Sequence, residues 1–193
     1  MNPYLHLDIP FNIKKEWKNS INNFDIAQNI SDSGCSLMEN ETRNFLSDMG
    51  INLYFANYWS WKYLTKSIYN TYHIDYPLDK PNNGNHTHAA LNFLLEGDPG
   101  ETQWTDFDKC IKLDRQVNSI YGTKGTNFIS KEEPKYMTSL IPKKVMLTRV
   151  DIPHRVSRDK QINTRWTYRM MLRTDDHVLT WDEAKSMFLK YSI

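Results

Sequence analysis

The sequence has little cysteine and no long apolar run, and each shortage excludes a class of protein. The two cysteines, Cys35 and Cys110, form no CxxC pair, which argues against a disulfide framework and a cysteine-rich zinc site. No segment approaches the roughly 18 apolar residues that a membrane-spanning helix needs. The first residues show no basic segment followed by an apolar one, as a signal peptide would. We therefore expect a cytoplasmic protein whose thiols stay reduced.

There is also little excess of charge. The chain has 24 Lys and Arg against 23 Asp and Glu, for a net charge of +1, which argues against a general nucleic-acid binder. The charge is uneven, however, because residues 142–173 are strongly basic. Two interpretations stay open: basic side chains that protect a strand edge from pairing, or an anionic ligand nearby.

Aromatic and β-branched residues gather in the middle of the chain and predict a mainly β structure. Strands are predicted at residues 51–59, 67–75, 88–95, 102–107, 144–151 and 164–173. Residues 76–85 are predicted to be a loop and 108–135 an irregular insertion, because of their Pro, Gly and Asn content. Many short strands favour a β-sandwich of the jelly-roll type.

Helical signals lie toward the two ends. Residues 31–34 are predicted to form a turn, and residues 39–49 a helix that ends at Gly50. Thr180 and Glu183 have the spacing of a capping box, which predicts the start of a C-terminal helix.

The length of 193 residues suits one domain with a sizeable core. We expect residues 1–50 to form a helical and irregular cover, 51–173 the jelly-roll core, and 174–193 the C-terminal helix.

Three residues have the order and type of an iron site. His73 and Asp75 stand two apart at the end of a predicted strand, so their side chains point to the same face. A second histidine, His154, follows the strand at 144–151. Two histidines and one carboxylate on one face of iron leave the opposite face open for a co-substrate and oxygen. The alternative is a surface His–Asp pair and an ordinary loop histidine.

Basic residues follow at short range on the last predicted strand. Arg165, Thr167 and Arg169 share one face, opposite to Trp166 and its neighbours. An inward Arg165 with the hydroxyl of Thr167 can bind a carboxylate. Arg169 is a rival for this role, whereas Arg155, next to His154, is expected to point away. A structural arginine paired with a core carboxylate is the alternative.

Together these residues resemble the iron(II)- and 2-oxoglutarate-dependent oxygenases. His73 and Asp75 resemble the HxD motif, residues 152–156 the strand end with the distal histidine, and Arg165 with Thr167 the Arg-x-Ser/Thr anchor. Two further segments resemble the strands that follow the HxD motif in small bacterial and phage members, at residues 89–95 and 101–104. The resemblance covers roughly residues 50–173.

The resemblance implies a double-stranded β-helix that binds iron(II), 2-oxoglutarate and O2 and forms succinate and CO2. The implied metal ligands are His73, Asp75 and His154. Since Asp75 is a carboxylate, where halogenating relatives have a small residue, hydroxylation is favoured. The implied substrate is a small molecule or an amino-acid side chain.

The resemblance also implies the residues that hold the other ligands. Arg165, assisted by Thr167, would hold the distal carboxylate of 2-oxoglutarate, and Asn92 would make a further polar contact to it. Trp104 would wall the pocket beside the substrate.

Other interpretations remain open. His86 and His88 are spaced as in cupins, but the following glutamate, Glu96, is too distant for that motif. We place both histidines at the mouth of the substrate pocket instead. A non-catalytic jelly-roll binding or structural module is an alternative function. A nucleic-acid substrate has no recognition motif to support it but stays open.

Overall fold

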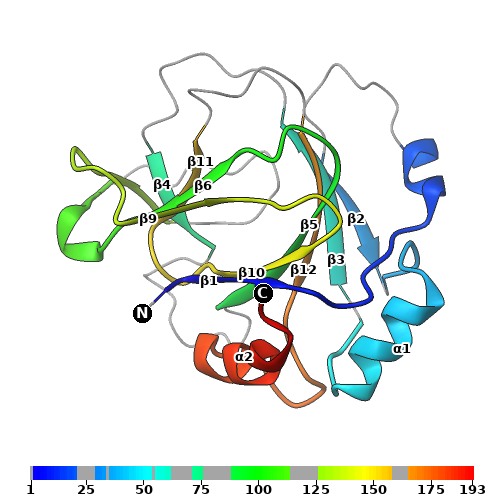
Figure 1. Cartoon of the computed structure of the whole chain (residues 1–193). Helices are drawn as coiled ribbons and strands as arrows, with labels where there is room; N and C mark the ends of the chain where they lie inside the picture. Colours follow the sequence, from blue (N-terminus) through cyan, green and yellow to red (C-terminus); the bar gives the residue numbers. More distant parts are fainter. Residues whose placement is uncertain are drawn as a thin grey trace.

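The computed structural model describes residues 2–20, 29–33, 35–53, 55–61, 71–75, 88–113, 126–157 and 165–193 (Figure 1). Within them the chain is mainly β, as predicted, with two antiparallel six-stranded sheets. The first sheet has the order β1 (Tyr4–Leu7), β10 (Val145–Arg149), β5 (Ala89–Gly97), β12 (Arg165–Met171), β3 (Phe55–Trp61) and β2 (Asn29–Ser33). The second has the order β7 (Ile111–Lys112), β8 (Thr126–Ile129), β4 (Thr71–Ile74), β11 (His154–Ser157), β6 (Glu101–Trp104) and β9 (Tyr136–Ser139).

Two α-helices lie next to the first sheet in the lower part of Figure 1: α1 (Asn40–Asp48) at the right and α2 (Trp181–Phe188) near the centre. Short 3₁₀ helices occupy Lys15–Ser20, Phe107–Lys109 and Leu189–Tyr191. No helix in the described part of the chain is both long and apolar enough to cross a membrane.

The two faces of β12 differ in polarity, because side chains alternate along a strand. On β12, Trp166 and Tyr168 join the main core together with Trp181 and Phe188 of α2. Arg165, Thr167 and Arg169 of the same strand line a pocket on the opposite face. β12 therefore buries its apolar residues under the helices and directs its polar residues toward the second sheet.

Both predicted helices are confirmed. Gly50 follows α1 with a φ of 74°, a conformation that glycine adopts without strain. At the start of α2, the Thr180 hydroxyl accepts a hydrogen bond from the Glu183 N–H, and the Glu183 carboxylate accepts one from the Thr180 N–H. This capping box is the one that the sequence predicts.

The N-terminal region contributes strands that the sequence analysis missed. β1 pairs with β10 along the edge of the first sheet, and β2 pairs with β3. The turn predicted at 31–34 is wrong for residues 31–33, which belong to β2; residue 34 lies outside the described part. Polar strands such as β2 carry no apolar alternation, so only pairing with a neighbour defines them.

Elsewhere the observed strands differ in their bounds from the predicted ones. The strand expected from residue 51 begins at Phe55, because the Ile51 N–H still bonds to Leu46 at the end of α1. The insertion at 108–135, expected to be irregular, contains β7 and β8, and β8 pairs with β4. β9 was also not predicted. The predicted loop at 76–85 lies outside the described residues.

The capping box gives a test of how α2 is held. We expect Thr180→Ala to lower the free energy of unfolding by about 1 kcal/mol, because the N–H of Glu183 loses its partner. Urea unfolding of the metal-free protein measures this. Ser186→Ala, an exposed change inside the same helix, should cost nothing. An equal effect of the two changes would contradict a role for the cap.

Candidate metal centre and adjoining pocket

The two histidines of the predicted site meet where β4 and β11 pair. His73 and His154 are direct partners in the ladder, and their ring centroids are 4.4 Å apart. Asp75 follows β4 directly, and its N–H donates to the carbonyl of Val150, which lies between β10 and β11. Strand pairing thus brings together residues that are about 80 positions apart in sequence.

The ligand atoms of these residues converge. Asp75 Oδ1 lies 3.6 Å from His73 Nε2 and 3.7 Å from His154 Nε2, and all three ligand atoms lie within 4.8 Å of one another. Three ligands on one octahedral face, each about 2.1 Å from a metal, lie about 3 Å apart. A slight contraction would therefore let the group hold a divalent ion.

Both imidazoles have the protonation state that a metal requires. The Nδ1–H of His154 donates to the carbonyl of Ile152 over 3.0 Å, which leaves the Nε2 lone pair facing Asp75. Burial lowers the pKa of His154 to about 4. Burial, with His154 and Arg169 nearby, also holds the pKa of His73 well below its usual value. The two rings are therefore neutral at physiological pH.

Arg169 holds the remaining oxygen of the carboxylate. Its Nη2 forms an ion pair with Asp75 Oδ2, and both side chains are almost buried. Burial lowers the pKa of Arg169 to about 10, so the guanidinium still carries its charge at neutral pH. Because Oδ2 is engaged, Oδ1 is the oxygen presented to the histidines.

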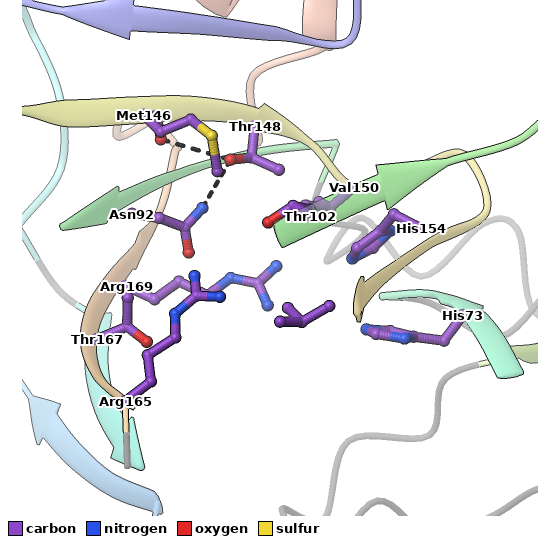
Figure 2. A pocket seen from close by; sticks show the side chains of 11 residues that line it. His73, Asn92, Thr102, Met146, Thr148, Val150, His154, Arg165, Thr167 and Arg169 are labelled. Atoms are coloured by element: carbon purple, nitrogen blue, oxygen red, sulfur yellow. Dashed lines mark hydrogen bonds between the residues drawn. The ribbon is translucent and has the colours of Figure 1, made fainter. Parts of the chain in front are cut away.

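A pocket between the two sheets leads away from the histidines. It is partly open to solvent at its mouth. Figure 2 shows His73 and His154 on one side of this space and the two arginines opposite. The lining residues are His73, Asn92, Thr102, Met146, Thr148, Val150, His154, Val156, Arg165, Thr167 and Arg169.

The chemistry of the lining suits an anion. Within the described part of the chain, the lining includes the guanidinium groups of Arg165 and Arg169, and that of Arg169 is already paired with Asp75. Thr167 Oγ1 is buried and has no hydrogen-bond partner among the described residues. Asn92 donates to the Thr148 hydroxyl over 2.8 Å. A bound carboxylate would give the Thr167 hydroxyl an acceptor.

Two neighbouring residues are placed outside the pocket. Arg155 points to the other face of the second sheet, as expected: it donates to Gln103 Oε1 over 2.8 Å and its guanidinium covers the Tyr72 ring. Trp104, expected to wall the pocket, is fully buried beside His154 and does not line the space. Its indole N–H donates to the carbonyl of Arg149 and its ring stacks on Tyr4.

The second histidine pair is only partly described. His88 contacts the Asp151 carboxylate over 3.2 Å and does not belong to the group of converging ligand atoms. His86 lies outside the described residues. The expectation that these two histidines border the substrate stays a prediction.

Part of the pocket lining was not predicted from the sequence. Thr102, Met146, Thr148, Val150 and Val156 were not proposed, although alternation along the strand predicted at 144–151 places three of them on one face. The contact of Arg169 with Asp75 has no local signal, because it joins residues 94 positions apart.

The sequence matches no protein-family model, and no curated protein is significantly similar to it. The function is therefore inferred from the residues of this chain alone.

We expect His154→Ala to weaken metal binding by at least about 100-fold, because removal of a ligand should exceed the 10- to 100-fold cost of disturbing its surroundings. Anaerobic titration of the purified protein with iron(II) or cobalt(II) measures the affinity. His88→Ala is the matched control and should keep the affinity of the wild type. Equal affinity of all three proteins would show that the metal does not bind at the triad.

The buried ion pair gives a second prediction. Asp75→Asn leaves the Arg169 guanidinium without its carboxylate, so we expect the free energy of unfolding of the metal-free protein to fall by about 3 kcal/mol. Adding Arg169→Met should recover most of this loss, because no charge is then left buried. If the two changes add up instead, as measured by urea unfolding, the side chains do not interact.

Proposed function

We propose that the protein is an iron(II)- and 2-oxoglutarate-dependent oxygenase that hydroxylates a small molecule or an amino-acid side chain. The observation that carries the proposal is the convergence of His73, Asp75 and His154 at one end of a pocket lined by Arg165 and Arg169. Two antiparallel sheets with the site between them also suit a double-stranded β-helix.

The donor set fits iron(II). Two neutral imidazoles and one carboxylate are the ligands of non-haem iron oxygenases, and this combination leaves coordination positions open. His73 is the most exposed ligand, with 31% of its side chain accessible, whereas His154 is almost buried. Access to the metal would therefore be from the side of His73.

Iron(II) with 2-oxoglutarate would supply the activation of O2 and the oxidative decarboxylation to succinate and CO2 that accompany hydroxylation. The chain would hold the co-substrate at its distal end. Arg165 offers a planar fork of donors for a carboxylate, and the buried Thr167 hydroxyl would add one hydrogen bond. Asn92 lies on the neighbouring strand and faces the same space (Figure 2).

The remaining lining residues would separate the reaction from water. Met146, Val150 and Val156 give the pocket apolar walls. Arg169 would keep the Asp75 carboxylate oriented, with one oxygen toward the metal. The protein would thus contribute ligation, orientation and exclusion of water.

The proposal is tested by adding iron(II) and then 2-oxoglutarate to the protein without oxygen. We expect a visible charge-transfer band from the chelate of iron with the oxo acid. Arg165→Ala should leave iron binding unchanged and weaken 2-oxoglutarate binding by about 10- to 100-fold, through loss of a charge-assisted fork. Arg155→Ala removes a guanidinium from the other face of the second sheet and should have no effect.

Two outcomes would contradict the proposal. A folded protein that binds neither iron nor 2-oxoglutarate would favour a non-catalytic binding module. Loss of metal in a His86/His88 double variant, with retention in His73→Ala, would favour a cupin-type site.

A further inference from the structure

We propose that Gly100 is a positioning residue that sets where the Arg165 guanidinium lies, and that it thereby controls 2-oxoglutarate binding. The inference rests on the proposed function, because it concerns the anchor of the same co-substrate. Gly100 has no part in the metal site and was not singled out by any sequence motif.

Gly100 lies in the turn that links β5 of the first sheet to β6 of the second. Its φ is +61°, and its N–H donates to Asp98 Oδ1 over 2.8 Å. At the start of this turn, Gly97 is the ladder partner of Arg165. The backbone of the turn therefore runs directly beside the proposed anchor.

The space at Gly100 is filled by the anchor itself. A Cβ at this position would lie 2.6 Å from Arg165 Nη1 and 3.4 Å from Arg165 Cδ and Val156 Cγ1. The first distance is shorter than real Cβ contacts reach, so the guanidinium would have to move. Arg165 is only 3% exposed, so its side chain is enclosed by protein over almost its whole surface.

The clash of a Cβ at Gly100 with Arg165 would change the position of the guanidinium more than the stability of the fold. The atom in conflict is the far end of a flexible side chain, which can shift while the strands stay paired. A displaced guanidinium loses the geometry needed to grip a carboxylate with two parallel hydrogen bonds. Loss of one charge-assisted hydrogen bond from this grip would lower the affinity for 2-oxoglutarate by roughly 10- to 100-fold.

The test compares Gly100→Ala with Gly50→Ala. Gly50 has a similar positive φ of 74° and no atom within 4 Å of the position of a Cβ, so it reproduces the backbone strain without the conflict. We expect similar melting temperatures for the two variants. Only Gly100→Ala should weaken binding of 2-oxoglutarate to the iron-loaded protein, by about 10- to 100-fold in anaerobic calorimetry. Iron affinity should be unchanged in both.

A double-variant cycle shows whether the effect passes through Arg165. In an Arg165→Ala background, Gly100→Ala should cause no further loss of 2-oxoglutarate affinity. The inference is wrong if the Gly100→Ala protein binds 2-oxoglutarate like the wild type. It is also wrong if Gly100→Ala weakens 2-oxoglutarate binding equally in the wild-type and Arg165→Ala backgrounds. If Arg165→Ala itself binds like the wild type, the proposed function has failed at its anchor.

A second variant covers the case in which Gly100→Ala does not fold. Arg165→Lys removes the Nη1 atom that meets the new methyl group, so Gly100→Ala combined with Arg165→Lys should melt no lower than Gly50→Ala combined with Arg165→Lys. If the Gly100 combination stays unfolded while the Gly50 combination folds, the conflict is not with Arg165 and the inference is overturned.

Discussion

The ion pair between Arg169 and Asp75 is the interaction on which the site depends. It joins β12 of the first sheet to the residue that follows β4 of the second, and both side chains are nearly excluded from solvent. An unpaired charge in such a place costs several kcal/mol, so the pair constrains how the two sheets meet. It also leaves Asp75 Oδ1 facing His73 and His154. The orientation of the candidate metal ligand is thus determined by protein contacts alone.

β12 supplies both the core and the pocket. The residues that face away from the second sheet, Trp166 and Tyr168, belong to the main apolar core, where Trp166 packs against Trp17 of the N-terminal region. The residues that face the second sheet include Arg165 and Arg169, which line the pocket. Because strand alternation fixes which residues face inward, apolar burial under the helices also positions the two guanidinium groups. The fold therefore stabilises a polar interior that would be costly by itself.

The sequence predicted the residues that carry strong local patterns. The alternation of β12, the HxD spacing at His73 and the capping box at Thr180 all have their expected structure. Polar edge strands such as β2 were missed, because pairing and not composition makes them extended. The contact of Arg169 with Asp75 was also missed, since it arises only when two sheets pack together. Trp104 shows a further limit: it pairs with His154 in the ladder, but it is fully buried, stacks on Tyr4 and does not line the pocket.

We propose that a divalent metal binds where His73, Asp75 and His154 converge, and that an oxo acid extends from it to Arg165. A crystal structure from anaerobic crystals grown with iron(II) and 2-oxoglutarate tests both parts directly. We expect metal density bonded to both histidine Nε2 atoms and to Asp75 Oδ1, with the distal carboxylate of 2-oxoglutarate against Arg165 and Thr167. Metal bound elsewhere, or a triad that stays without metal in the presence of excess iron, would contradict it.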